Sequence, residues 1–222
     1  VGDATFPSPR ECQGLARIKR EQQLSYSLHT PLDVSLASSD ERRRRESVVA
    51  VRRAIEVAVP FAPEVYIVHV YLGEREHDAH VPTDLCAWRR RAARSLEELL
   101  ALGLASRDLC VESLDYDLRL LEPVLEDLDI SVALDVGHLL RDGRDESEVL
   151  ERHLHRTRVI QWHGVTAAGK DHRSLRHYPR ARAQGLLEVL TRANYQGVLT
   201  LEVFTEHDLE ESKAEGELRH PI

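Results

Sequence analysis

The chain has 222 residues, of which 42% are hydrophobic, and its formal net charge is −8. This length and apolar content can supply one sizeable core, so we expect a single domain over residues 1–222. No run of about eighteen apolar residues and no cleavable leader is found, which argues against membrane insertion or export and predicts a soluble, cytoplasmic protein. The acidic balance argues against nucleic-acid binding, because proteins that bind nucleic acids normally carry a concentrated basic surface.

The three cysteines, Cys12, Cys86 and Cys110, are far apart in the sequence. Without a C-x-x-C pair they indicate neither a disulfide framework nor a thiolate zinc site, so we expect free thiols. The sequence begins at Val1 and contains no methionine. We therefore expect that further residues precede Val1.

Short β-rich runs alternate with longer helical patterns, which is typical of a parallel sheet covered by helices. The predicted strands are Leu24–His29, Val65–Val70, Leu109–Ser113, Ser131–Asp135, Val159–His163 and Val198–Val203. The first predicted helix opens with a capping box of Ser38 and Glu41 and runs to Pro60. Further helices are predicted near Asp84–Gly103, Leu118–Leu128, Glu146–His155 and Arg180–Ala193.

These elements make fewer β/α units than a closed barrel needs, since a (β/α)8 barrel has eight strands and typically about 250 residues. We therefore expect an α/β fold, a (β/α)8 TIM barrel that lacks its first one or two β/α units in this chain. The basic run Arg42–Arg45 is interpreted as an exposed first turn of the helix that follows Ser38. The acidic segment Glu206–Glu217 is interpreted as a solvated helix or a frayed end.

The two faces of the predicted strands differ in composition. Because strand side chains alternate between faces, each strand can be divided into two rows. One row is apolar, as in Tyr66, Val68 and Val70, and is expected to face the helices. In all six strands the other row ends on a side chain that can bind a metal. These residues are His29, His69, Glu112, Asp135, His163 and Glu202.

Six such groups at the carboxyl ends of strands indicate an active site, because α/β barrels build their sites there. A single histidine or glutamate in this place is more often a hydrogen-bonded, half-buried group. Clustered carboxylates, however, repel one another and resist desolvation unless a cation holds them together. Imidazole and carboxylate ligands without thiolate favour zinc, manganese, iron or cobalt over calcium and magnesium. We expect zinc or manganese.

Six short motifs, in this order, resemble those of one superfamily: HTPLD (His29–Asp33), VHV around His69, ESL at Glu112, LDVGH (Leu134–His138), WHGV around His163 and LEVF around Glu202. Over nearly its whole length the chain is similar to the xylose isomerase-like TIM barrels. That superfamily includes the endonuclease IV-type enzymes of AP endonuclease family 2 and many sugar isomerases and epimerases. Each motif is weak alone, whereas the ordered set is specific.

The resemblance to the endonuclease IV-type enzymes implies two, or three, divalent metal ions. His29 and His69 would bind one ion, and Glu112 would bridge it to a second. The other residues implied for the second ion are Asp135, His163 and Glu202.

A third ion would be held by His138, Asp171 and His172. The family pattern separates that aspartate and histidine by one residue, whereas here they are adjacent. Neighbours in an extended chain point in opposite directions. The resemblance therefore leaves open whether this ion is absent or bound differently.

The sugar isomerases and epimerases of this fold need one metal, for which Glu112, Asp135, His163 and Glu202 would suffice. They have no evident need for the imidazoles of His29, His69 and His138. These favour a multi-metal hydrolase, in which one ion lowers the pKa of a bound water and others stabilise charge on phosphorus. We therefore expect a metal-dependent phosphodiester hydrolase whose catalytic residues are Glu112 and Glu202, which would hold the ions around the attacking hydroxide.

The loop after His163 carries the basic residues Lys170, Arg173 and Arg176. We interpret them as substrate-binding, because their cationic groups suit a phosphate; a solvated loop is the alternative. His77, Asp78 and His80 follow His69 and are interpreted as a lid or plain surface. Cys110 shares a face with Glu112 and is expected to fill barrel space.

Abasic-site DNA repair is the best-known activity of the AP endonuclease family, but the acidic balance argues against DNA. A small or medium phosphoester suits the composition better. The HTPLD, DVGH, HGV…KDHRSL and LEVF motifs are similar to those of cobamide-remodelling phosphodiesterases, which cleave the nucleotide loop of B12-type cofactors. The resemblance thus implies a corrinoid phosphoester as substrate. The alternatives are a single-metal sugar isomerase or epimerase, an AP endonuclease-like DNA repair enzyme, and a binding protein without turnover.

Overall fold

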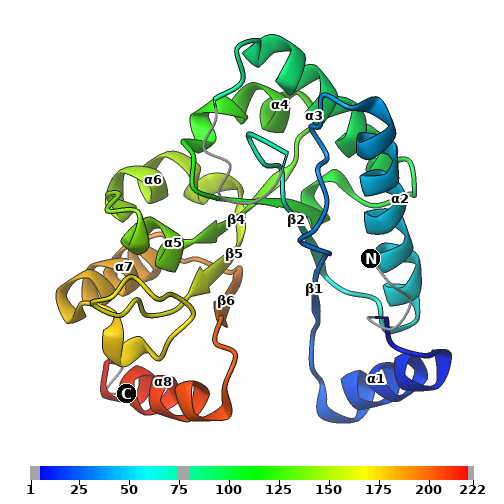
Figure 1. The fold of residues 1–222 in the computed structure, drawn as a ribbon. Coiled ribbons are helices and arrows are strands. Elements are labelled where there is room, and N and C mark those ends of the chain that lie inside the picture. Colours follow the sequence, from blue (N-terminus) through cyan, green and yellow to red (C-terminus); the bar gives the residue numbers. More distant parts are fainter. Residues whose placement is uncertain (1–5, 75–80, 220–222) are drawn as a thin grey trace. The chain divides into compact units, whose positions relative to one another are not determined.

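The chain divides into two compact units, Val1–Ser131 and Val132–Ile222. The computed structural model describes residues 6–74 and 81–219, and Figure 1 shows their elements in chain order. A single domain over residues 1–222 stays a prediction.

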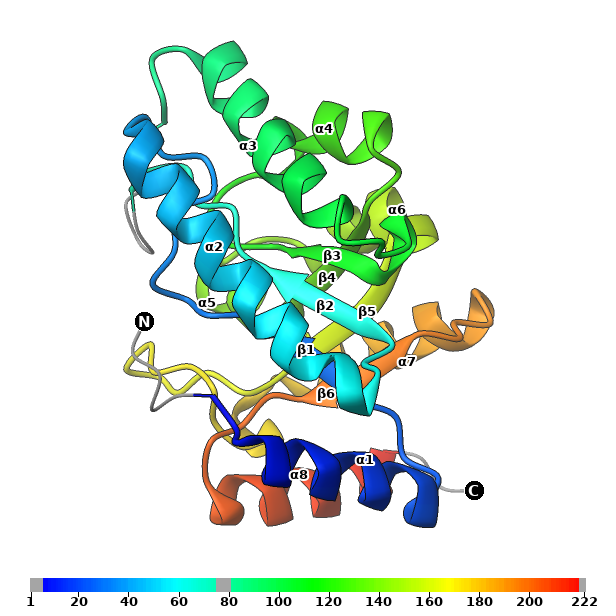
Figure 2. The ribbon, with the colours of Figure 1, turned by 90° about the vertical axis from the view of Figure 1, so that its right-hand side faces the viewer.

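The first unit contains three parallel strands in sequence order. β1 (Ser27–His29) pairs with β2 (Val65–Val68), and β2 pairs with β3 (Leu109–Glu112). Figure 2 shows two helices of this unit, α2 and α3, side by side along the sheet. The helices are α1 (Pro9–Gln22), α2 (Glu41–Ala58), α3 (Leu85–Leu100) and α4 (Glu122–Asp127), with 3₁₀ turns at Val59–Phe61, Ser106–Asp108 and Leu118–Leu120.

The second unit is built in the same way. β4 (Ser131–Asp135) pairs with β5 (Thr157–Trp162) and β5 with β6 (Val198–Leu201), all parallel. Its helices are α5 (Val136–Arg141), α6 (Glu146–His153), α7 (Arg180–Arg192) and α8 (Glu206–Arg219), with 3₁₀ turns at Leu154–Arg156 and Leu175–His177. All six predicted strands are thus confirmed, although several are shorter than predicted; β1, for example, begins at Ser27 rather than Leu24.

The apolar row of the first strand faces the helices, as predicted. Tyr26 and Leu28 pack against a buried cluster of Cys12, Ala58 and Phe61. Because side chains alternate along a strand, His29 points to the opposite face of the sheet. None of the three cysteines forms a disulfide bond within the described residues, and Cys12 and Cys110 are buried.

The helix after the first strand begins differently from the prediction. Its N-cap is Asp40, whose carboxylate accepts hydrogen bonds from the backbone N–H groups of Arg42 and Arg43. Ser38 instead donates to Glu74 at 2.6 Å. A capping box of Ser38 and Glu41 is therefore wrong, because aspartate, an equally good N-cap, occupies the position directly before the helix.

The expectation that Arg42–Arg45 forms an exposed turn is wrong for Arg44, which is 0% exposed. Its guanidinium donates to Glu41 at 2.9 Å, to Glu98 of α3 at 2.9 Å and to Ser95 at 2.8 Å. Since α2 packs against α3, the side of α2 that carries Arg44 is covered, and the charge is retained because carboxylates and a hydroxyl surround it.

Two observed helices, α1 and α5, are not among the predicted ones. α1 has a capping box in which Ser8 accepts from the Glu11 N–H and Glu11 accepts from the Ser8 N–H, with Pro9 at the first helical position. The stretch Ser8-Pro9-Arg10-Glu11 therefore carries a sequence signal for a helix start. α5 begins directly after β4, without the intervening loop that such signals normally mark.

The acidic C-terminal segment is a docked helix rather than a frayed end. In α8, Asp208 accepts a hydrogen bond from the Ser174 N–H at 3.0 Å, and Ser212 accepts one from the Leu175 N–H at 3.0 Å.

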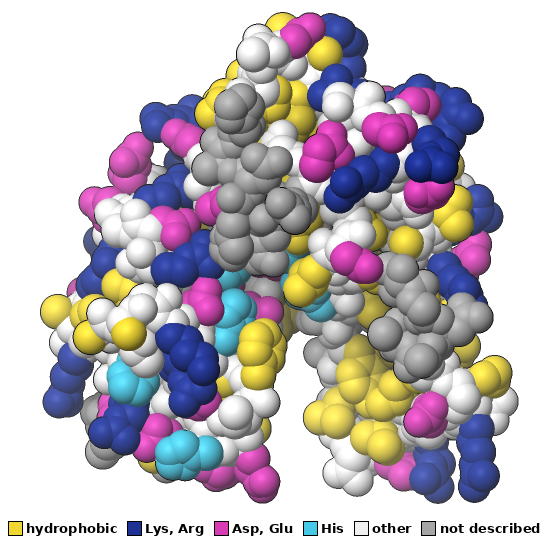
Figure 3. Space-filling model, in the orientation of Figure 1, with side chains coloured by type: hydrophobic (Ala, Val, Ile, Leu, Met, Phe, Trp, Pro, Cys, Tyr) yellow, Lys and Arg dark blue, Asp and Glu magenta, His cyan; other side chains and the backbone are white. Residues whose placement is uncertain are grey.

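On the face drawn in Figure 3, Lys and Arg side chains are interspersed with Asp and Glu. None of the described helices is long and apolar enough to span a membrane.

Candidate metal centres

The metal-capable residues lie at the carboxyl ends of the strands, as predicted. His29, Glu112 and Asp135 are the last residues of β1, β3 and β4. His69, His163 and Glu202 follow the ends of β2, β5 and β6. Within each unit, parallel pairing places these ends on the same edge of the sheet.

The first unit contains what we call the first cluster, His29, His69 and Glu112, whose ligand-capable atoms lie within 4.8 Å of one another. The Nε2 atoms of both imidazoles lie 3.0 Å from the same carboxylate oxygen, Glu112 Oε2. The carboxylate is 2% exposed and the His69 side chain 4% exposed, whereas His29 is partly open to solvent.

The tautomers of both histidines follow from their outer hydrogen bonds. His29 Nδ1 lies 3.0 Å from the Thr30 carbonyl, which can only accept, so Nδ1 carries the proton. Tyr71 donates its hydroxyl proton to the Leu32 carbonyl at 3.0 Å, so the Tyr71 oxygen accepts from His69 Nδ1 at 2.7 Å. In the neutral imidazoles both Nε2 atoms therefore direct lone pairs at Glu112.

Lone pairs that face a carboxylate at 3.0 Å repel it unless a positive charge lies between them. Burial of Glu112 would by itself raise the pKa of its carboxyl, but His69 and His29, when protonated on Nε2, lower that pKa well below its usual value. With the neutral imidazoles, a bound cation would supply that positive charge instead. The carboxylate is thus ionised and buried, with two imidazole nitrogens aimed at it. This donor set fits a divalent cation such as Zn²⁺, with Thr30 and Tyr71 orienting the ligands.

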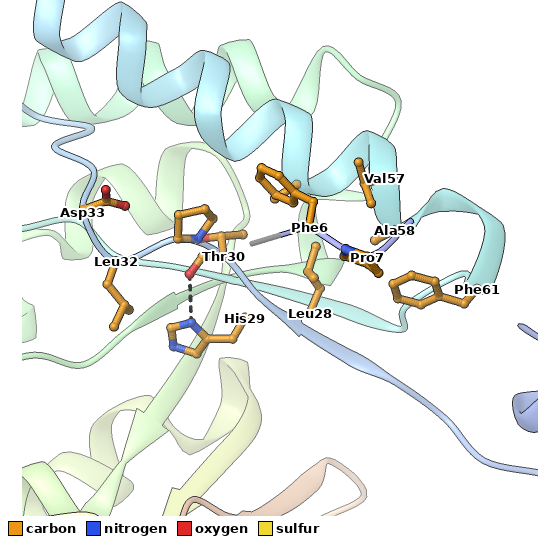
Figure 4. A pocket seen from close by; sticks show the side chains of 12 residues that line it. Phe6, Pro7, Leu28, His29, Thr30, Leu32, Asp33, Val57, Ala58 and Phe61 are labelled. Carbon is orange, nitrogen blue, oxygen red and sulfur yellow. Dashed lines mark hydrogen bonds between the residues drawn. The ribbon is translucent and has the colours of Figure 1, made fainter. Parts of the chain in front are cut away.

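A pocket of about 330 Å³ adjoins His29 and is drawn in Figure 4. Its lining is mainly apolar and includes Leu28, Val57 and Phe61. The Thr30 hydroxyl oxygen is buried and makes no hydrogen bond within the described residues. Of the first cluster only His29 lines this pocket, which lies mainly on the helix side of β1, where Leu28 packs, rather than on the face to which His29 points.

The second unit contains what we call the second cluster, Asp135, His138, His163 and His172. Asp135 Oδ2 lies 3.2 Å from His138 Nδ1, and Asp135 Oδ1 lies 3.2 Å from His163 Nε2. Asp135 also caps α5, because its Oδ1 accepts the His138 N–H at 2.8 Å. Asp135 and His163 are 0% exposed. One carboxylate and three imidazoles are again ligands that suit zinc or manganese.

The ring of His163 is held closely on both faces. It stacks on His172, with centroids 4.3 Å apart and planes at 14°. The ring also lies against the backbone of Gly137, where an added Cβ atom would be only 2.2 Å from His163 Cε1. Only glycine therefore leaves room at position 137, and the helix start of α5 supports the ring directly.

The protonation of His163 depends on two competing contacts of Nδ1. The backbone N–H of His172 donates to it at 3.0 Å, and the Gly164 carbonyl lies 3.3 Å away. Burial would lower the pKa of His163, but Asp135, helped by Gly164 and by the charge of Glu202, raises it. His163 could offer Nε2 to a metal only with its proton on Nδ1 and the Gly164 carbonyl as acceptor, a state that excludes the hydrogen bond from the His172 N–H.

A family model, described as xylose isomerase-like TIM barrel, matches residues 3–220. This chain belongs to the xylose isomerase-like TIM barrel family. The search among curated protein sequences found no significant match. Solved structures confirm the fold but, at their low identities, only the fold.

Two epimerase-type proteins and an endonuclease are among these structures. A D-tagatose 3-epimerase-like protein is 19% identical, covers 96% of this chain and 83% of its own, and has a TM-score of 0.78. The 3-keto-D-glucoside 4-epimerase from E. coli is 15% identical, with 98% and 96% covered and a TM-score of 0.67. Endonuclease IV from Thermus thermophilus is 20% identical, with 96% and 83% covered and a TM-score of 0.67.

In this xylose isomerase-like chain, the adjacent residues Asp171 and His172 do not form an extended pair. His172 has a φ of 52°, a left-handed conformation that is uncommon for a residue other than glycine. The backbone therefore turns at this point, and His172 joins the second cluster. Asp171 is not a member of that cluster; its carboxylate contacts Arg141 at 2.7 Å and His172 Nδ1 at 3.2 Å.

Charged neighbours explain the pKa values of this pair. Burial would raise the pKa of Asp171, but hydrogen bonds from Arg141 and His172 lower it to about 2. The pKa of His172 is lowered by burial and by the nearby His163, against the opposing effect of Asp171. The carboxylate is therefore ionised while the imidazole tends to be neutral, the form that binds metals.

Glu202 lies near the second cluster without being a member of it. Its Oε2 accepts a hydrogen bond from Gln161 at 2.8 Å, and its backbone N–H donates to the Trp162 carbonyl at 3.1 Å. The carboxylate is near enough to contribute to the raised pKa of His163. Its expected role as a ligand stays a prediction.

The basic loop is more engaged with the protein than the sequence indicates. Arg176 contacts Glu211 of α8 at 2.7 Å, and Arg173 contacts Asp208 at 3.4 Å. Lys170 is exposed in the loop that follows β5. The two arginines thus help to dock α8, and their expected contact with substrate stays a prediction. The predicted lid residues His77, Asp78 and His80 lie outside the described residues.

Three residues at these clusters are absent from the sequence-based site: Tyr71, Gly137 and Arg141. Tyr71 lies two residues after His69, and Arg141 lies three residues after His138 in a helix. Residues three apart in a helix lie on the same face, so the spacing from His138 could have indicated that Arg141 lies near the site. The role of Gly137 depends on a contact with a residue 26 positions away and has no local signal.

Proposed function

We propose that this protein is a metal-dependent phosphodiester hydrolase that acts on a small or medium phosphoester. The observation that carries the proposal is that each unit contains its own histidine-rich cluster with a buried carboxylate. Two such clusters provide separate places for divalent cations, most naturally Zn²⁺ or Mn²⁺.

The donor count favours a hydrolase over a single-metal sugar isomerase or epimerase. An epimerase would need Glu112, Asp135, His163 and Glu202 for one ion. It would leave unexplained the imidazoles of His29 and His69, whose outer hydrogen bonds direct both Nε2 atoms at Glu112. The epimerase alternative is kept because two of the similar solved structures are described as epimerases or epimerase-like.

Divalent cations bound here would supply Lewis acidity that activates water and offsets charge on phosphorus. Within the chain, Glu112 would hold a cation together with His29 and His69, and we propose that its carboxylate would also serve a second ion. Glu202 is assigned to the second cluster as a further carboxylate. Both are proposed as catalytic residues.

Charge distribution supports a small substrate rather than DNA. The net charge is −8, and the basic and acidic side chains on the face in Figure 3 are mixed. Arg173 and Arg176 are paired with α8, which reduces the cationic surface that a nucleic-acid backbone would need. We propose the nucleotide loop of a cobamide as that substrate, on the similarity of the HTPLD, DVGH and LEVF motifs.

The test combines metal analysis with substrate panels. Protein loaded with Zn²⁺ or Mn²⁺ should bind at least one ion per cluster and hydrolyse members of a phosphodiester panel that includes adenosylcobalamin. Release of a corrinoid phosphate would support the cobamide proposal. A single bound ion, together with ketose epimerisation and no phosphodiester cleavage, would establish the epimerase alternative instead.

A further inference from the structure

The pair Asp171–His172 departs from the spacing expected for two metal ligands, and the structure separates their roles. His172 is a member of the second cluster, whereas Asp171 is not. The Asp171 carboxylate lies instead between two partners, with Oδ2 2.7 Å from Arg141 Nη1 and Oδ1 3.2 Å from His172 Nδ1.

Arg141 is well suited to hold this carboxylate in place. Its side chain is only 16% exposed. The guanidinium contacts two carboxylates, Asp171 through Nη1 and Asp142 through Nε at 2.8 Å. A planar fork bound at both edges has little freedom to rotate, so it defines where the Asp171 oxygens lie.

Both the backbone and the ring of His172 are restrained by neighbouring residues. Its left-handed backbone, φ 52°, allows its N–H to donate to His163 Nδ1 at 3.0 Å. Its ring is stacked between His163, at 4.3 Å, and Phe204, at 4.6 Å, both with planes at 14°. Stacking fixes the plane of the ring but not which way the ring is flipped about its Cβ–Cγ bond.

The contact with Asp171 supplies the missing restraint. A carboxylate next to Nδ1 keeps the proton on Nδ1, so the Nε2 lone pair is the one available to a cation. A carboxylate–imidazole–metal arrangement of this kind raises the basicity of the ligand and sets its orientation.

We infer that Asp171 is a positioning residue held by Arg141, which orients His172 as a ligand of the second cluster without binding the cation itself. The inference depends on the proposed cation site but not on the reaction, so it is tested by metal binding.

The test is a double-mutant cycle on Co²⁺ affinity, read by visible absorption, in the full chain with the first cluster disabled by His29→Ala and His69→Ala. If Asp171 acts only through His172, Asp171→Ala should weaken Co²⁺ binding about 10–100-fold, the usual effect of losing an orienting partner. Asp171→Ala combined with His172→Ala should then be no weaker than His172→Ala alone. The absorption band of Asp171→Ala should keep the intensity of the parent, because the ligand number is unchanged.

Additive losses in the double variant, or a changed band in Asp171→Ala alone, would show that Asp171 is a ligand and overturn the inference. The role of Arg141 is tested by Arg141→Gln, which should lower Co²⁺ affinity about tenfold, and by Arg141→Lys, which should recover part of it. The matched control is Arg52→Gln, which removes an exposed pair with Glu56 at 2.8 Å on α2 and should leave affinity unchanged.

Equal affinities of Arg141→Gln and Arg52→Gln would remove Arg141 from the inference. Far-UV circular dichroism and thermal unfolding of each variant separate misfolding from loss of orientation. If the parent binds no Co²⁺ at the second cluster, both the inference and the proposed cation site fail. If it binds Co²⁺ but cleaves no phosphodiester, only the proposed reaction fails.

Discussion

Substitution of Gly137 by alanine should displace His163 and weaken the second cluster. The added Cβ would lie 2.2 Å from His163 Cε1 and 2.4 Å from both ring nitrogens. Carbon atoms in favourable contact are about 3.5–4.0 Å apart, so the ring must move by more than about 1 Å. His163 is 0% exposed and stacked on His172, so it has no free space to enter.

Two effects of opposite sign decide the stability of this variant. Alanine is favoured over glycine in a helix by about 0.5–1 kcal/mol, and less in a first turn such as that of α5. Overpacking a filled site costs about 1–3 kcal/mol, so the net effect should be destabilising. Gly185 of α7 is the matched control, because a Cβ there would meet nothing within 4 Å. Gly185→Ala should therefore be neutral or stabilising.

The assay is urea unfolding of the metal-free protein together with Zn²⁺ titration. The free energy of unfolding of Gly137→Ala should fall about 1–3 kcal/mol below that of Gly185→Ala. Zn²⁺ affinity at the second cluster should fall at least tenfold, since the His163 nitrogen is moved from its place. A Gly137→Ala protein that matches Gly185→Ala in both measurements would refute the assignment of His163 to a tightly packed metal centre.

Other contacts lead to three more tests. Glu112→Gln should reduce both metal content, measured by elemental analysis, and phosphodiester turnover, and retention of both would exclude Glu112 as a shared ligand. Tyr71→Phe, which removes the acceptor of the His69 Nδ1 proton, should lower Zn²⁺ affinity of the first cluster about 10–100-fold, and unchanged affinity would contradict the tautomer argument. The pKa of Glu41 is lowered from 4.5 to about 2, chiefly by hydrogen bonds from Arg44. Because the pKa of Glu41 is lower in the folded than in the unfolded protein, its hydrogen bonds to arginine stabilise the fold above pH 4.5. This stabilisation is lost as the pH falls towards 2. Glu41→Gln should flatten the pH dependence of thermal unfolding in that window, and an unaltered profile would show that the pair contributes nothing.

Much of the fold was predictable because strand patterns are local. Alternation of apolar and polar residues identified all six strands, and Pro, Gly and charged residues marked most helices. α5 follows β4 without a loop, and α1 carries a capping signal that the predictions did not use. The prediction that Arg44 is exposed was wrong, because helical periodicity tells which residues share a face but not how much of that face a neighbouring helix covers.

The candidate site, like the fold, has features that the sequence predicts and features that only the structure shows. By itself, the sequence determined which residues end the strands, because side-chain alternation assigns each strand end to one face, and in this way His29, His69, Glu112, Asp135 and His163 were all identified. Only the tertiary structure decided which of them share an oxygen, which groups face the Nδ1 atoms of His29 and His69, and that Asp171 lies between Arg141 and His172 without joining the cluster. These properties depend on hydrogen bonds between residues distant in sequence and on a backbone turn at His172, neither of which leaves a periodic signal in the chain.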